Sequence, residues 1–352
     1  MLTKDEQYMQ RCLELARKGA GYVAPNPMVG AVLVYDDRII GEGWHELYGQ
    51  AHAEVNAIKH AVSKGNESLI SRSTLYVSLE PCAHQGKTPP CDQLIIQYKI
   101  PHVIIGCRDP FPSVNGKGIE HLINEGIKVK VGVLEQDCIE LNKRFFCFHI
   151  HKRPYIVLKW AQTEDGFIGS GTAERLLISG TAANRLVHRW RSEEAAIMVG
   201  SATVALDNPQ LTNRSGTGAQ PVRVVLDRDL KLSPAFQVFD GSVRTIILNQ
   251  VKQEENNLSY IQINPQLDII DGVCDALYKN NIQSVLVEGG ARLLSLFIQS
   301  GCWDEARVIT NTKLKAGVGL AAPVLTNAQL QKKDQFDDDI ITYWINHKNN
   351  NS

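Results

Sequence analysis

Four residues in the first third of the chain have the types and spacing to bind and use a metal ion. His52 and Glu54 stand two positions apart, Cys82 follows a proline, and Cys91 comes nine positions later. One imidazole and two thiolates supply three ligands of a tetrahedral zinc site and leave the fourth position open for water, as in catalytic sites. Zinc lowers the pKa of its bound water, so hydroxide is available near neutral pH. The residues therefore predict a catalytic Zn²⁺ centre.

Glu54 is expected to carry a proton rather than to bind the metal. Residues at i and i+2 do not share a helix face, so His52 and Glu54 reach one site only if the N-terminal end of a helix points at the metal. Glu54 would then take a proton from the water and pass it to a leaving amine. A His-x-Glu sequence followed by Pro-Cys and a further Cys is the signature of zinc deaminases.

Three other interpretations of this cluster stay open. A structural zinc site needs a fourth ligand, for which His84 and, less well placed, Cys107 are candidates. A non-catalytic, zinc-stabilised binding module would unfold when the metal is removed. A deaminase of another amino-substituted base, free or in nucleic acid, is the third. Against nucleic acid, the cysteines are not spaced Pro-Cys-x-x-Cys, and the formal net charge is −1.

The elements that must position these residues belong to a chain of two domains. Its 352 residues and 39.1 kDa exceed what one hydrophobic core usually holds. A hydrophobic fraction of 43% and a charged fraction of 21% are typical of a globular protein. No apolar run is long enough to span a membrane, and the charged N-terminus is no signal peptide. With eight cysteines, too few for a disulfide scaffold, this predicts a cytoplasmic protein with no membrane partner.

Apolar periodicity predicts alternating strands and helices, and hence an α/β fold with mainly parallel sheets. In the first half we expect strands over 28–35, 38–42, 74–79, 102–107 and 129–133, and helices over 5–18, 53–64, 91–97 and 118–125. In the second half we expect strands over 155–160, 195–199, 222–226, 245–248 and 284–287, and helices over 181–191, 268–278 and 291–299. The segment between Leu141 and Pro154 changes composition, which predicts domains over 1–147 and 153–346 and a disordered tail over 347–352.

The second half lacks the Gly-x-Gly-x-x-Gly fingerprint of dinucleotide-binding folds. It does contain Val287-Glu288-Gly289-Gly290-Ala291-Arg292, which follows a predicted strand and opens a predicted helix. Adjacent glycines in this position let backbone N–H groups approach a phosphate. Such turns are also common because glycines allow close packing, so the motif alone does not distinguish a phosphate-binding turn from a packing turn.

Taken together, these motifs resemble the bifunctional deaminase/reductase family of riboflavin biosynthesis. In the first half the resemblance rests on 25–30, 43–45, 52–54 and above all 81–91 (PCAHQGKTPPC), and in the second on 159–161, 165–166, 200–204, 207–212 and 287–290. It implies an N-terminal cytidine-deaminase-like zinc domain and a C-terminal dihydrofolate-reductase-like domain. The first would deaminate 2,5-diamino-6-ribosylamino-4(3H)-pyrimidinone 5′-phosphate. The second would reduce the ribosyl group to ribityl with NADPH. The resemblance also implies a homo-oligomer, a dimer or tetramer.

The resemblance also implies roles for individual residues. In the first domain the substrate would contact Asn26, His45, His84 and Lys87, with Lys87 able to pair with the phosphate. In the second, Lys159, Asp207 and Glu288 would be catalytic. The cofactor would contact Ala161, Leu177, Thr203, Asp207, Arg228, Gly290, Ala291 and Arg292. The substrate would contact Arg175, Arg191, Leu211, Arg214 and Glu288, with Arg191 and Arg214 at its phosphate.

Two positions depart from the family pattern. Phe111 stands where the family more often has asparagine, whose contact Asn115 could replace. Leu177 stands where we expect tryptophan, so a stacking surface for the cofactor or substrate is missing. The second departure leaves open an active deaminase joined to an inactive or differently specific C-terminal domain.

Overall fold

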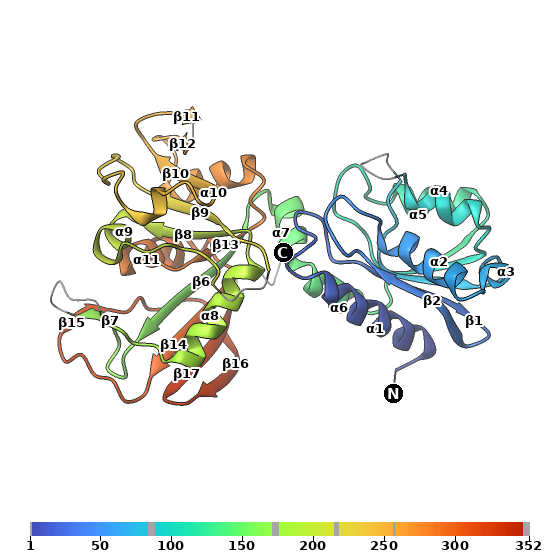
Figure 1. Cartoon of the computed structure of the whole chain (residues 1–352), viewed down its shortest axis with the longest axis horizontal. Coiled ribbons are helices and arrows are strands. Elements are labelled where there is room, and N and C mark those ends of the chain that lie inside the picture. The colour runs from blue at the N-terminus through green and yellow to red at the C-terminus, as the bar shows by residue number, and fades with distance from the viewer. Residues whose placement is uncertain (1, 84–88, 171–175, 215–217, 256–257, 348–352) are drawn as a thin grey trace. The chain divides into compact units, whose positions relative to one another are not determined.

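The computed structural model describes residues 2–83, 89–170, 176–214, 218–255 and 258–347 (Figure 1). The chain separates into two compact units, Met1–His151 and Lys152–Ser352. Both units alternate strands and helices, so the predicted α/β class is confirmed. In the described part of the chain, no helix is long and apolar enough to cross a membrane.

The first unit is built on a five-stranded mixed sheet in the order β2-β1-β3-β4-β5. Its strands are β1 (Gly30–Tyr35), β2 (Arg38–Trp44), β3 (Thr74–Leu79), β4 (His102–Cys107) and β5 (Lys128–Val131). Strand β1 runs antiparallel to both β2 and β3, whereas β3, β4 and β5 are parallel. The parallel strands therefore place the segments that follow them, including the one with Cys82, at the same edge of the sheet.

Helices cover both faces of this sheet. They are α1 (Lys4–Ala16), α2 (Ala53–Ser63), α3 (Glu67–Ile70), α4 (Cys91–Gln97), α5 (Lys117–Asn124), α6 (Glu135–Leu141) and α7 (Lys143–His151), with a 3-10 turn at Arg17–Gly19. One core packs side chains of α2, α4 and α5, such as Ala57, Ile95 and Leu122, against alternate strand residues. The opposite core contains Leu13 of α1 and Phe145 of α7. The period-two alternation of strand side chains explains both faces.

Two glycines of β2 bring helix α2 unusually close to the sheet. A Cβ atom at Gly43 would lie 2.4 Å from the backbone nitrogen of Ala57, and one at Gly41 would lie 2.4 Å from its carbonyl oxygen. Any side chain at either position would push the helix away. Because α2 begins directly after His52, the close packing of α2 on β2 also sets the distance of His52 from the sheet.

The second unit contains a ten-stranded sheet in the order β11-β12-β10-β9-β8-β13-β6-β14-β17-β16. Its strands are β6 (Tyr155–Gln162), β8 (Ala196–Gly200), β9 (Val222–Leu226), β10 (Thr245–Asn249), β11 (Glu254–Glu255), β12 (Ser259–Gln262), β13 (Ser284–Val287), β14 (Glu305–Asn311), β16 (Ala328–Phe336) and β17 (Asp339–Asn346). A separate two-stranded sheet pairs β7 (Phe167–Ser170) with β15 (Gly319–Ala321). The helices are α8 (Thr181–Glu193), α9 (Ser201–Asp207), α10 (Ile269–Lys279) and α11 (Ala291–Ser300), with a 3-10 turn at Gln237–Phe239.

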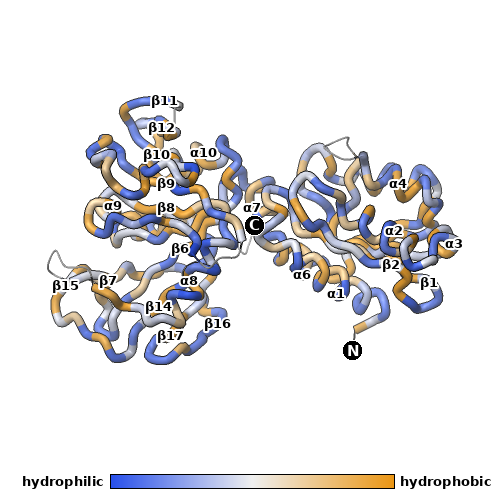
Figure 2. Tube along the Cα trace, viewed as in Figure 1, coloured by the Kyte–Doolittle hydropathy of each residue, from blue (hydrophilic) through white to orange (hydrophobic). Residues whose placement is uncertain are grey.

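The predicted elements are present with ends shifted by a few residues, but the sequence analysis did not anticipate the C-terminal strands. β14 runs parallel to β6, and β17 and β16 add an antiparallel extension beyond it to a mostly parallel sheet. Strand β16 reads AQLQKKDQF and is mostly exposed, so it lacks the apolar alternation that marks a half-buried strand. Figure 2 shows the contrast, with β8 and β9 largely hydrophobic and β16 largely hydrophilic.

The segment expected to join the domains also contains more structure than expected. KRFFCFHIH forms helix α7, in which Phe145, Phe146 and Phe148 are buried. At the other end, the described chain stops at His347, whose backbone N–H donates to the Asn327 carbonyl at 2.8 Å. The rest of the predicted disordered tail lies outside the described residues.

Candidate metal centre and nucleotide site

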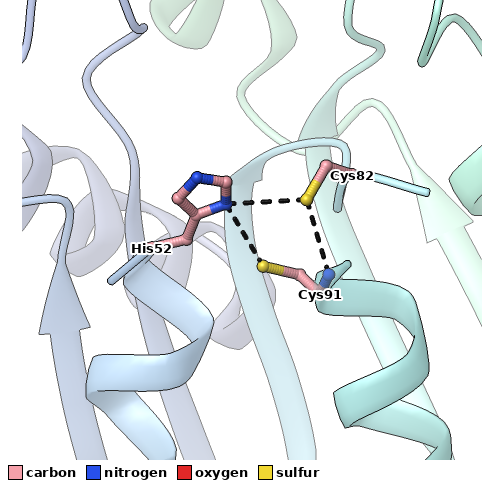
Figure 3. Close-up of side chains that lie close together, drawn as sticks. All are labelled: His52, Cys82 and Cys91. Atoms are coloured by element: carbon pink, nitrogen blue, oxygen red, sulfur yellow. Dashed lines mark hydrogen bonds between the residues drawn. The ribbon is translucent and has the colours of Figure 1, made fainter. Parts of the chain in front are cut away.

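Three segments of the first unit bring His52, Cys82 and Cys91 together (Figure 3). His52 is the N-cap residue of α2, Cys82 lies in the turn after β3, and Cys91 is the first residue of α4. Figure 3 shows the imidazole and both sulfur atoms pointing toward a common point. Among the described residues, these are the His, Cys and acidic side chains that cluster closely enough to hold a metal ion.

The separations within the cluster fit zinc. His52 Nδ1 lies 3.5 Å from Cys82 Sγ and 3.4 Å from Cys91 Sγ. Tetrahedral zinc with its usual ligand distances places a nitrogen and a sulfur about 3.6 Å apart. The donor set of one imidazole and two thiols is also one that zinc prefers. The residues present therefore suit this metal without rearrangement.

Glu54 is buried in the first turn of α2, with 3% of its surface exposed. The hydrogen bond with Cys82 and burial raise the pKa of the Cys91 thiol, and the nearby Glu54 carboxyl group raises it further. Burial raises the pKa of Glu54 itself to about 7. His52 and Glu54 both lie at the N-terminal end of α2, which is the arrangement expected from their spacing of two residues.

Asn26 and His45 lie beside the cluster and are bonded to each other. His45 Nδ1 lies 3.1 Å from the Ala51 carbonyl oxygen, which can only accept, so Nδ1 carries the proton. His45 Nε2 then accepts from Asn26 Nδ2 at 3.2 Å. Burial lowers the pKa of His45, which favours this neutral form. The ring stands edge-on to that of His52, with centroids 5.4 Å apart.

Several expectations for the first unit fall elsewhere. His84 and Lys87 lie outside the described residues. The Cys107 thiol donates to the Ser78 carbonyl at 3.4 Å and packs in the core, away from the three-residue cluster. Phe111 is half-buried, with its ring centroid 5.0 Å from that of His149, and Asn115 is exposed.

In the second unit three of the predicted polar residues, Lys159, Arg191 and Glu288, meet at the carboxyl end of the parallel strands. Val287 of β13 pairs with Leu158 of β6, so Glu288, directly after β13, comes next to Lys159 of β6. Lys159 Nζ lies 3.9 Å from Glu288 Oε2. Arg191 of α8 donates from Nε and Nη2 to the two Glu288 oxygens, at 2.6 and 2.8 Å.

Glu288 is buried, with a side chain that is 6% exposed. Burial alone would raise the pKa of Glu288, but the charge and hydrogen bonds of Arg191, together with Lys159, lower it overall. Arg191 Nη1 also donates to the Thr212 carbonyl at 3.2 Å. Arg191 is therefore a partner of Glu288, and its Nε, Nη1 and Nη2 atoms each donate a hydrogen bond within the unit.

The predicted cofactor residues Thr203 and Gly290 are neighbours. Gly290 has a φ of 58°, and a Cβ atom there would lie 3.2 Å from Thr203 Oγ1. Gly290 is the N-cap of α11, which begins with Ala291 and Arg292. A left-handed glycine at a helix start keeps backbone N–H groups open to a phosphate, so this end of α11 suits a dinucleotide such as NADPH.

The remaining expectations for the second unit are placed less closely together. Ala161 is half-buried on β6, and Asp207 is the half-buried last residue of α9. Leu211 is buried in the core with Val199 and Val225. Leu177 is 75% exposed, and Arg228 is exposed just after β9. Arg175 lies outside the described residues.

His188 is a polar residue of this site that the sequence analysis missed. Its Nδ1 accepts from the Arg214 backbone N–H at 3.4 Å, so in the neutral ring Nε2 carries the proton. That Nε2 lies 3.5 Å from Arg214 Nη2, which is also a donor. Two donors side by side suit an anion placed between them. The spacing of His188 and Arg191, three residues apart on one helix face, is the signal that could have identified His188.

Comparisons with known proteins agree with both halves. The family model described as "Cytidine and deoxycytidylate deaminase zinc-binding region" matches residues 2–107, and the one described as "RibD C-terminal domain" matches residues 154–338. The predicted pair of domains, cytidine-deaminase-like and dihydrofolate-reductase-like, is confirmed. Riboflavin biosynthesis protein RibD of Synechocystis is 39% identical over 92% of this chain and 88% of the relative. The Escherichia coli protein of that name is 33% identical over 88% of each.

Solved structures agree over the whole chain. A diaminohydroxyphosphoribosylaminopyrimidine deaminase/5-amino-6-(5-phosphoribosylamino)uracil reductase from Thermotoga maritima is 38% identical, with a TM-score of 0.88 over 97% of this chain and 99% of that one. RibD from Acinetobacter baumannii is 33% identical, also with a TM-score of 0.88, over 97% of this chain and 98% of its own. The resemblance seen in the motifs is confirmed: the chain belongs to the RibD family of riboflavin biosynthesis proteins.

Proposed function

We propose that this protein catalyses two consecutive steps of riboflavin biosynthesis. The first unit deaminates 2,5-diamino-6-ribosylamino-4(3H)-pyrimidinone 5′-phosphate, and the second reduces the ribosyl group of the product to ribityl with NADPH. We assign the deaminase to residues 1–147 and the reductase to 153–346. The observation that carries the proposal is the zinc-fitting cluster of His52, Cys82 and Cys91 with the buried Glu54 beside it.

In the deaminase, His52, Cys82 and Cys91 would hold zinc, which when bound polarises a water molecule and lowers its pKa. Glu54 takes a proton as water adds to the ring carbon and delivers it to the departing amine, so the C–N bond breaks and ammonia leaves. Its burial keeps this proton transfer away from bulk water. We assign the substrate ring and ribose to Asn26 and His45, which the hydrogen bond between them holds in place.

In the reductase, NADPH when bound would supply a hydride to C1 of the opened sugar, while the nitrogen or oxygen atom double-bonded to C1 takes up a proton. The start of α11, with Gly290, Ala291 and Arg292, and Thr203 beside it would bind the cofactor. Lys159, held next to Glu288, is the cationic group assigned to the reacting carbon. We place the substrate phosphate at Arg214, where the donors of Arg214 and His188 converge.

Mass spectrometry of the proposed substrate, incubated with purified zinc-replete protein with and without NADPH, tests both steps. We expect deamination alone without NADPH and the reduced product only with it. Deamination without reduction in the presence of NADPH would instead support an active deaminase joined to a differently specific second domain. Absence of both reactions would refute the substrate assignment.

Two further assignments belong to this proposal. We expect a homo-oligomer, a dimer or tetramer, that works in the cytoplasm without nucleic-acid or membrane partners. Light scattering coupled to size-exclusion chromatography measures the mass directly. A mass of about 39 kDa would refute the oligomer, because 39.1 kDa is the mass of one chain.

A further inference from the structure

Each cysteine of the metal cluster has a buried acidic residue close to it in the sequence, and the chemistry proposed above uses neither acid. Glu80 stands two positions before Cys82, and Asp92 directly follows Cys91. Glu80 is 4% exposed and Asp92 is fully buried. A buried carboxylate is costly unless its oxygens are bonded, so the partners of these two residues indicate what they do.

The partners of Glu80 are backbone N–H groups at and before the start of helix α5. Its Oε1 accepts from Gly118 at 3.1 Å and Ile119 at 3.4 Å, and its Oε2 from Gly116 at 2.9 Å and Asp109 at 3.2 Å. The first N–H groups of a helix have no partner within it, and they carry the positive end of its dipole. Both oxygens of Glu80 are therefore committed to holding α5.

The same helix start lies directly against the segment that contains Cys82. A Cβ atom at Gly118 would lie only 2.0 Å from the Pro81 carbonyl oxygen. Nothing larger than glycine fits there without moving either α5 or the Pro81-Cys82 backbone. Glu80 and Gly118 together thus fix the position of Cys82 from two sides.

Asp92 connects the second cysteine to the same helix. Its Oδ2 lies 2.6 Å from Nδ1 of His121, in the middle of α5, and its Oδ1 accepts from the Gln93 N–H at 2.6 Å. The Asp92 N–H donates to the Cys82 carbonyl at 3.3 Å, and the Cys91 N–H points at Cys82 Sγ at 3.4 Å. Helix α5 therefore contacts both cysteine segments through one carboxylate each.

We propose that helix α5, through Glu80, Gly118, Asp92 and His121, is a clamp that holds Cys82 and Cys91 in metal-binding geometry. These are positioning residues, and the proposal rests on the zinc-dependent function given above. Partners that orient metal ligands typically contribute 10- to 100-fold in metal affinity or activity. Loss of the clamp would let the two sulfur atoms move apart, so zinc would leave faster while the reductase keeps working.

The Glu80→Gln variant tests the clamp with almost no change in shape. In either orientation its amide directs an NH₂ donor at two backbone N–H donors. We expect zinc release to a chelator, followed with a colorimetric indicator, to be about tenfold faster or more than in the wild type. With Co²⁺ in place of zinc, we also expect a shifted thiolate-to-cobalt absorption band. Glu120→Gln makes the same chemical change on the exposed face of α5, so it should match the wild type in both measurements.

The His121→Ala variant tests the contact between Asp92 and α5. We expect this variant to fold, because the His121 side chain is 42% exposed. We expect faster zinc release than in the wild type, by a smaller factor than for Glu80→Gln. Wild-type release and cobalt spectra in a folded Glu80→Gln protein would overturn the clamp. If Glu80→Gln does not fold, wild-type release from His121→Ala would overturn it. Zinc binding by the wild type itself tests the proposed deaminase. A wild type that binds no zinc would refute both the deaminase and the clamp, whereas a zinc-binding wild type with unchanged variants would refute the clamp alone.

Discussion

At the metal centre, three ligand atoms from three segments lie within 4.8 Å of one another, at separations that zinc requires. In the second unit, the buried charges of Lys159, Arg191 and Glu288 are instead satisfied by one another. The first site thus presents a set of ligand atoms that fits one kind of ion, whereas the second is a balanced network of charges whose task depends on the molecule that binds beside it. A metal site is specified by ligand chemistry, which a short motif carries, whereas a site for organic ligands is specified by which strands and helices become neighbours.

Removal of the metal is the change with the largest expected effect on this comparison. Chelation should abolish deamination, because no metal ion remains to polarise the attacking water, and it should leave the NADPH-dependent step running. Parallel assays of both reactions before and after dialysis against a chelator, with zinc restored as the control, measure this. Loss of the reductase along with the deaminase would mean that the two sites are not independent.

The Glu54→Gln variant separates metal binding from proton transfer. Glutamine has the same shape but cannot take up a proton, so deamination should fall about 10²- to 10⁴-fold while zinc content stays at the wild-type level. Steady-state rates and metal analysis of the same preparation check both statements. A full deaminase rate would refute the role of Glu54, and loss of zinc would show that it acts in binding.

The Glu288→Ala variant tests the balanced network of the second unit. It leaves the buried cations of Arg191 and Lys159 without their anion, so we expect a loss of about 3–5 kcal/mol in the free energy of unfolding of that unit. Denaturant unfolding and reductase activity report it, and deamination serves as the internal control. Unchanged stability would show that the network is held together mainly by other contacts.

The pH dependence of stability tests whether the ionised Glu288 carboxylate stabilises the second unit. Because the pKa of Glu288 is lowered in the folded protein, its stabilising contribution is present above the unfolded value of about 4.3 and is lost as the pH falls through the folded value. The difference in unfolding free energy between wild type and Glu288→Gln should therefore be largest near neutral pH and shrink in acid. A difference that grows in acid would contradict the lowered pKa.

The smallest expected effect concerns the departure at Leu177. Because this side chain is 75% exposed, Leu177→Trp should fold normally and add an aromatic surface. If Leu177 borders the cofactor, stacking worth about 0.5–1.5 kcal/mol would tighten NADPH binding by roughly two- to tenfold. Fluorescence titration with NADPH measures the dissociation constant. An unchanged constant would place Leu177 away from the cofactor.

The two sites also differ in how far sequence predicts them. His52, Glu54, Cys82 and Cys91 could be assigned to one centre because their chemistry restricts how they can be arranged. The pairing of Arg191 with Glu288 could not, since the two residues are 97 positions apart and meet only through the order of β13, β6 and α8. Strand β16 was missed for a different reason, because an edge strand exposed to water carries little apolar periodicity.

The close contact between α2 and β2 has a consequence for how this chain can vary. Gly41 and Gly43 have no side chain to contribute to the chemistry, yet each has a backbone atom of Ala57 where a side chain would begin. A saturation library selected for deaminase activity should accept only glycine at both positions, as strictly as it accepts only cysteine at 82 and 91. Positions that tolerate no substitution in such a library would then include packing residues of the fold as well as metal ligands. Only the structure distinguishes these two kinds of position.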